Sequence, residues 1–140
     1  MCRWKDVPCK YGRGRVIIPA QVIRDACQII WQAAQQRQLI DYSTVIDQLK
    51  ARGHHTRAPI NRITIGKIVG EVSDQVSQNT NPSVYPSAIV VRRGTNRPGK
   101  GFWGLSKGTN PPSRVPSANQ RAAIRQYQND VFTRKWACNC

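Results

Sequence analysis

The chain of 140 residues contains 22 lysines and arginines against 7 aspartates and glutamates, which gives a formal net charge of +15 at pH 7. This length fits one domain with a buried core. The sequence has no apolar run of about 18 residues, so we expect no transmembrane helix and no membrane partner. A surplus of positive charge attracts polyanions, so nucleic acid is the first partner that we expect.

The N-terminal residues 1–18 are rich in lysine and arginine and show no clear periodicity. We therefore expect an irregular basic arm with a short strand at Val16–Ile18, followed by a single domain over 19–140. No apolar segment follows the basic start, as a secretory signal would require, and this favours a cytoplasmic location.

Three helices are predicted from the spacing of apolar residues. The first covers about 20–37, because apolar side chains recur every three or four positions from Ile23 onwards. The second is short, with Ser43 as its expected N-cap and Gly53 as its stop. The third begins near Thr64 and carries a stripe of isoleucine and valine.

The segment after the third helix predicts a β-hairpin. Ser87–Arg93 is mostly apolar and β-branched, Gly101–Leu105 can pair with it, and the tip between them holds Arg97 and Lys100. A final helix is expected over 118–136. Helix, short helix, helix and basic hairpin is the order of a winged helix-turn-helix, whose third helix enters the major groove while the wing contacts phosphates. We therefore predict an α+β, winged helix-turn-helix-like fold, in which helices pack with a small β-hairpin wing and a C-terminal helix.

The basic charge is concentrated in the second half of the chain. No acidic residue lies between Gln75 and Asn129, whereas eight lysines and arginines do. The predicted hairpin lies inside this stretch, and this supports a contact between its tip and phosphate groups.

Three short motifs occur in the order that a known family has them: Tyr42–Ile46, Gly66–Gly70 and Pro86–Val90. With the glycine-rich segment that follows, they resemble the DNA-binding domain of O6-alkylguanine-DNA alkyltransferases and alkyltransferase-like proteins. The resemblance implies that Tyr42 crowds the target phosphate and that Lys67 stands for the arginine that fills the hole left by a flipped base. It also places Ser87 where that family has its acceptor cysteine.

The departures from that family predict that the chain is not an enzyme. Ser87 is not a thiolate, and the histidine and arginine that follow the acceptor cysteine are replaced by Ala88 and Ile89. A serine without a base is a poor nucleophile. The chain also resembles uncharacterised bacterial and phage proteins over Arg93–Phe102 and again around Trp136, which implies that the terminal helix belongs to the fold.

We expect the residues that contact nucleic acid at the start of the second helix, in the connector before the third helix, on the third helix and on the wing. They are Tyr42, Arg57, Arg62, Lys67, Arg92, Arg93, Arg97 and Lys100. The expected function is non-catalytic binding of nucleic acid, DNA in preference to RNA, with no small-molecule substrate. Two alternatives stay open: a structural RNA-binding or ribonucleoprotein component, and a small phage-type protein that inhibits an acidic host protein.

The cysteines and histidines carry the remaining chemistry. Cys27 lies on the apolar face of the first helix and is interpreted as a small buried side chain. The other four cysteines lie at the two ends of the chain: Cys2, Cys9, Cys138 and Cys140. Free thiols, disulfides and a structural zinc held by four thiolates are all open for them, and no other cofactor is expected. We interpret the adjacent His54 and His55 as part of a solvated loop.

Overall fold

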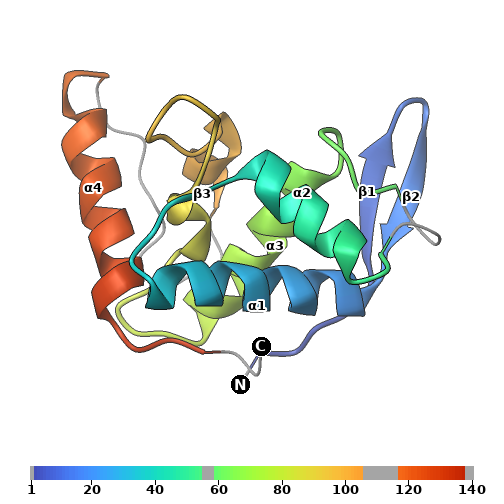
Figure 1. The fold of residues 1–140 in the computed structure, drawn as a ribbon, viewed down its shortest axis with the longest axis horizontal. Coiled ribbons are helices and arrows are strands. Elements are labelled where there is room, and N and C mark those ends of the chain that lie inside the picture. The colour runs from blue at the N-terminus through green and yellow to red at the C-terminus, as the bar shows by residue number, and fades with distance from the viewer. Residues whose placement is uncertain (1, 55–58, 106–116, 138–140) are drawn as a thin grey trace.

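A computed structural model describes residues 2–54, 59–105 and 117–137, and within them the fold is α+β (Figure 1). The strands and α-helices run in the order β1 (Val7–Tyr11), β2 (Gly14–Ile18), α1 (Ala20–Gln35), β3 (Ile40–Asp41), α2 (Tyr42–Ala51), α3 (Ile65–Gln78), β4 (Val90–Val91) and α4 (Ser117–Thr133). Two short 3-10 helices flank the basic loop, η1 (Pro86–Ile89) and η2 (Lys100–Gly104). The predicted α+β class is confirmed. No helix in the described residues is long and apolar enough to cross a membrane.

The N-terminal segment is a β-hairpin, so the prediction of an irregular arm is wrong. Strands β1 and β2 pair antiparallel, with Val7 opposite Ile18, and Gly12 turns the chain at φ +60°. Val7, Cys9 and Ile18 are buried while their neighbours face outward. Charged residues on the outer face conceal this alternation in the sequence, although it is the pattern of a half-buried strand. The hairpin stands beyond the end of α1 that is farthest from α4 (Figure 1).

The predicted helices are confirmed, with different ends. Helix α1 stops at Gln35 and packs against α2 and α3 through a buried face of isoleucine, valine and alanine. Helix α2 is capped by Asp41 rather than Ser43, because the Asp41 carboxylate accepts a hydrogen bond from the Thr44 N–H at 2.7 Å. Gly53 ends the helix at φ +90°, as expected. Helix α3 begins at Ile65.

The predicted β-hairpin wing is absent. Residues 86–89 form η1, and only Val90–Val91 of this segment is a strand. It pairs in parallel with β3, which directly precedes α2 in the chain. Residues 83–91 are all buried. A run covered on every side suits a parallel pair and leaves no solvent-exposed face for a two-stranded wing. The expected second strand is η2, so a loop over 92–99 replaces the hairpin tip.

Helix α4 closes the structure on the side of this loop, as Figure 1 shows. It packs on η1 and buries Ile124, Gln128 and Val131. Beyond its end at Thr133, the Trp136 indole N–H donates to the Val131 carbonyl at 2.9 Å and holds the chain against the core. Through Gln128, α4 also contacts the 92–99 loop at the Asn96 carbonyl.

Candidate nucleic-acid interface

A cavity of about 590 Å³ opens between α2, α3, η2 and the 92–99 loop. Its apolar walls come from α2, α3, η2 and the residue after η2, and consist of Ile46, Ile65, Val69, Phe102 and Leu105. Its polar lining includes the carboxylates of Glu71 and Asp74 and the hydroxyl groups of Tyr42 and Ser87. Four cations also line it, Arg62, Lys67, Arg92 and Arg93. We call this cavity the α3 pocket.

Tyr42 ties α2 to the basic loop. Its hydroxyl oxygen accepts a hydrogen bond from the Gly99 N–H at 2.9 Å. A Cβ atom at position 99 would lie 3.0 Å from that oxygen, so a glycine permits the close approach. Burial raises the pKa of the Tyr42 phenol above its ordinary value of 10.0, although the Gly99 N–H and Arg92 act in the opposite direction. The phenol is therefore neutral at pH 7 and holds the loop without neutralising its charge.

Asp41 joins the same loop to the start of α2. Its carboxylate accepts the capping bond from Thr44 and lies 3.7 Å from Arg93 Nε, measured from Oδ2. The Thr44 hydrogen bonds lower the pKa of Asp41 below 3.8, and Arg93 lowers it further. One carboxylate thus serves as helix cap and as the partner of a loop cation.

Lys67 and Glu71 form an ion pair on α3, with Lys67 Nζ 3.0 Å from Glu71 Oε1. The Lys67 side chain is 44% exposed whereas that of Glu71 is 6% exposed, so the carboxylate lies inside the pocket and the ammonium group at its mouth. Sequence reasoning missed Glu71, since an acid beside the apolar stripe of a helix is usually solvated. Its position four residues after Lys67 is the one signal that pointed to this pairing.

Ser87 lines the α3 pocket and is almost fully buried. The Ser73 hydroxyl donates to Ser87 Oγ at 2.6 Å, and the Ser87 N–H donates to Ser73 Oγ at 2.7 Å. The two side chains therefore join α3 to η1. A serine hydroxyl is not a general base, and this contact does not activate Ser87 as a nucleophile.

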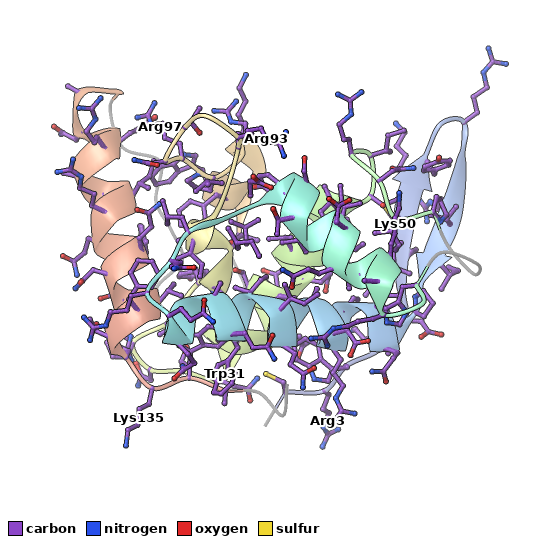
Figure 2. The ribbon with its side chains drawn as sticks, viewed as in Figure 1. Arg3, Trp31, Lys50, Arg93, Arg97 and Lys135 are labelled. Carbon is purple, nitrogen blue, oxygen red and sulfur yellow. The ribbon has the colours of Figure 1, made fainter. Side chains whose placement is uncertain are left out.

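The 92–99 loop is held from the other side by Gln128. This buried amide donates from Nε2 to the carbonyls of Ala88 and Asn96, both at 3.0 Å. The loop also closes on itself, because the Arg92 N–H donates to the Arg97 carbonyl at 3.0 Å. Figure 2 shows Arg93 and Arg97 extending from this loop at one edge of the molecule, opposite Arg3 and Lys135.

The structure brings together five of the eight residues predicted to contact nucleic acid: Tyr42, Arg62, Lys67, Arg92 and Arg93 line the α3 pocket. Arg97 faces a separate depression beside α4, and Lys100 is exposed on η2 without lining either cavity. Arg57 lies outside the described residues. Phe102 is buried in the core and forms part of the wall of the α3 pocket.

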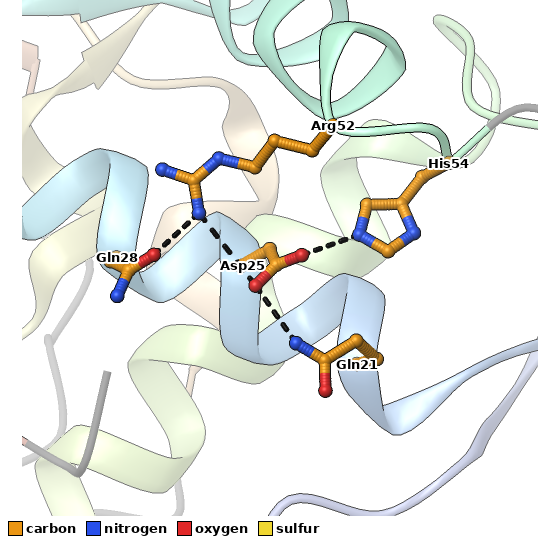
Figure 3. Close-up of polar contacts among 5 residues, drawn as sticks. All are labelled: Gln21, Asp25, Gln28, Arg52 and His54. Atoms are coloured by element: carbon orange, nitrogen blue, oxygen red, sulfur yellow. Dashed lines mark hydrogen bonds and ion pairs between the residues drawn. The ribbon is translucent and has the colours of Figure 1, made fainter.

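A second polar cluster joins α1 to the end of α2 (Figure 3). His54 Nε2 lies 2.5 Å from Asp25 Oδ2, and Arg52 lies 3.6 Å from the other oxygen of the same carboxylate. Gln21 and Gln28 complete the cluster. The interpretation of His54 as solvated loop is therefore wrong, since its side chain is 17% exposed and paired. His55 lies outside the described residues.

Of the states left open for the terminal cysteines, the described residues show a disulfide and a free thiol. Cys2 and Cys27 are both buried and each takes part in a disulfide, while Cys9 is a free, buried thiol. Cys2 is therefore not available as a thiolate ligand, and Cys27 is more than a small apolar side chain. Cys138 and Cys140 lie outside the described residues. In the part of the chain that the structure describes, no three His, Cys, Asp or Glu side chains gather in a way that could hold a metal ion. Disulfides persist mainly in oxidising compartments and are rare in the cytoplasm. The cytoplasmic location therefore gains no support from the structure and stays a prediction.

Comparison of the chain with protein-family models, with curated proteins and with solved structures finds no match.

Proposed function

We propose that the chain binds double-stranded nucleic acid, DNA in preference to RNA, and catalyses no reaction. One observation carries this proposal: Arg62 and Lys67 from one segment of the chain, and Arg92 and Arg93 from another, line a single cavity at the face formed by α3 and the 92–99 loop. Arginine and lysine that converge in this way neutralise backbone phosphates and release bound counterions.

The order of the helices supports the orientation of that contact. Helix α1 packs against both α2 and α3, and Gly66 and Lys67 in the first turn of α3 line the pocket. On the proposal, α2 and α3 act as a helix-turn-helix-like pair that presents this turn to a groove, and the 92–99 loop takes the place of a wing. Lys67 keeps Glu71 as its partner until a phosphate group competes for it.

The α3 pocket suits a base that has left the helical stack. Its volume of about 590 Å³ falls within the usual range of ligand sites. Its apolar walls can contact the faces of a base, while Glu71 and Asp74 can accept hydrogen bonds from ring or amino N–H groups. This agrees with the flipped base implied by the alkyltransferase resemblance. Binding without alkyl transfer is supported by the Ser73–Ser87 pair, because neither hydroxyl is a base.

Fluorescence anisotropy tests the proposal with duplex DNA, single-stranded DNA and structured RNA at one salt concentration. We expect the duplex DNA to compete best, and Arg92→Gln with Arg93→Gln to weaken binding to all sequences alike. The slope of log K against log salt should fall by about 0.9 for each lost phosphate contact. The matched control is Arg3→Gln with Lys135→Gln, which removes the same charge at the opposite edge.

Two outcomes contradict the proposal. Preference for structured RNA would favour the ribonucleoprotein alternative, and a loop variant that binds duplex DNA as well as the control does would remove the loop from the interface. Capture of an acidic protein from nuclease-treated lysate, with no nucleic-acid binding, would favour the inhibitor alternative.

A further inference from the structure

A second depression, of about 770 Å³, lies on the other side of the 92–99 loop, between that loop and α4. Arg97 from the loop and Arg121 and Arg125 from α4 line it, and Gln128 lies within it. The loop therefore separates the two cavities. Arg92 and Arg93 face the α3 pocket, whereas Arg97 faces what we call the α4 depression.

The α4 depression is strongly positive. Among its described lining residues there is no aspartate or glutamate, and within the described residues none of the three arginines is in an ion pair. This contrasts with the α3 pocket, where two carboxylates offset part of the charge. Arg121 and Arg125 are four residues apart on one face of α4, and like charges at this spacing destabilise a helix. An anion bound between them would relieve that repulsion.

The donors that remain for a ligand are the guanidinium groups. Gln128 Nε2 donates to two backbone carbonyls, and the Thr95 hydroxyl donates to the Arg92 carbonyl, so both serve the loop. A guanidinium group is planar and donates two parallel hydrogen bonds, a geometry that matches phosphate oxygens. Ala118, in the first turn of α4, also lines the depression, and the start of a helix favours negative charge.

We propose that the α4 depression is a phosphate-binding site. This inference rests on the proposed function, since the phosphate is taken to belong to the backbone of the bound nucleic acid. A strand that crosses the 92–99 loop would contact Arg92 and Arg93 on one side and the three arginines on the other. The site extends the interface beyond α3 to α4, which the helix-turn-helix-like arrangement alone does not include.

The test uses Arg121→Gln with Arg125→Gln in the full chain, since both side chains are exposed and the substitutions keep helix-forming residues. The control is again Arg3→Gln with Lys135→Gln. At about 0.1 M salt we expect duplex affinity to fall about eightfold for each lost phosphate contact, because the binding constant scales with about the −0.9 power of salt per contact. The salt slope should fall with it. A variant that binds like the control overturns the inference.

A second measurement separates a backbone phosphate from a free one. The NMR signals of the arginine Nε–H groups are followed while inorganic phosphate or a nucleoside monophosphate is added. Shifts at Arg121 and Arg125 in a protein that binds no duplex would support the phosphate site and contradict the proposed function. If Arg92→Gln with Arg93→Gln abolishes duplex binding while the α4 variant changes nothing, the proposed function stands and this inference fails. Binding of polyglutamate but not of phosphate would also overturn it.

Discussion

Gln128→Met removes the amide that holds the basic loop while it keeps the length of the side chain. Gln128 is 8% exposed, and Nε2 donates to the Ala88 and Asn96 carbonyls. Ala88 is fully buried, so its carbonyl has no water to replace the lost donor. Loss of the bond to Ala88 should lower the free energy of unfolding by about 1 to 3 kcal/mol. Asn96 is exposed, and its carbonyl can turn to water at a cost below about 1 kcal/mol.

We therefore expect the free energy of unfolding to fall by about 2 kcal/mol. For a chain of this length the entropy of unfolding near the midpoint is about 0.3 kcal/mol per kelvin, so Tm should fall by about 7 °C. Denaturant titration and calorimetry measure these two quantities. Gln126→Met is the matched control, because Gln126 is on the same helix, is exposed and donates a hydrogen bond to Asp130 at 3.2 Å. It should change stability by less than about 0.5 kcal/mol.

Hydrogen exchange separates loop release from a general loss of stability. The Arg92 amide, which donates to the Arg97 carbonyl, should exchange faster in Gln128→Met by more than the core amides of α1 do. Equal stability of Gln128→Met and Gln126→Met would refute the anchoring role. So would unchanged exchange at Arg92, since the loop would then keep its shape without the amide.

Four further variants test the polar contacts of the site. Asp41→Ala removes the α2 cap and should lower the free energy of unfolding by about 1 kcal/mol at neutral pH. Because the folded pKa of Asp41 lies below 3.8, this stabilisation is present above that value and disappears as pH falls through the folded pKa. Unfolding titrations of variant and wild type should therefore converge in acid. Tyr42→Phe removes the acceptor of the Gly99 N–H and should cost about 1 kcal/mol. Since the pKa of Tyr42 is raised above 10.0, its neutral phenol stabilises the fold below that value. The free energy of unfolding should decline as pH rises through the folded pKa, which absorbance titration of the phenol locates. Ser87→Ala should leave duplex binding nearly unchanged, and intact mass should show no adduct after incubation with O6-alkylguanine DNA. Ser73→Ala should destabilise more, because it also leaves the buried Ser87 N–H without its acceptor.

The helices could be predicted because their information is local. Apolar residues that recur every three or four positions fixed α1 and α3 to within about two residues at their starts. The N-terminal hairpin was missed for a local reason too: its apolar alternation is short, and Lys10, Arg13 and Arg15 make the segment look uniformly basic.

The prediction of a wing was wrong because the strand pairing in this segment is not local in sequence. The apolar run before Arg92 fits an exposed hairpin strand as well as a buried strand, and the sequence does not say which. The choice is made by β3, which lies about 50 residues earlier in the chain and pairs with β4 in parallel. Gln128 shows the same limit in the site. Its acceptors are 40 and 32 residues away, and an interior glutamine of a helix carries no pattern that indicates them.

The way in which the loop is held bears on what its charge is for. A basic loop can be fixed by ion pairs, which would neutralise its cations, or by neutral hydrogen bonds, which leave them available. Here Tyr42 and Gln128 fix the backbone at Gly99 and Asn96 as neutral groups, and among the described residues only Asp41 pairs with a loop arginine.

The loop therefore has a fixed backbone and cations that keep most of their charge. Mutual repulsion of those cations makes this arrangement unfavourable in the free protein, and two uncharged anchors, the half-buried Tyr42 and the buried Gln128, offset that cost. On the proposed function, a bound polyanion would remove this repulsion without requiring the backbone to move, and the loop would be preorganised for phosphate. A surface that needed positive charge only for solubility would gain nothing from two uncharged anchors under one loop.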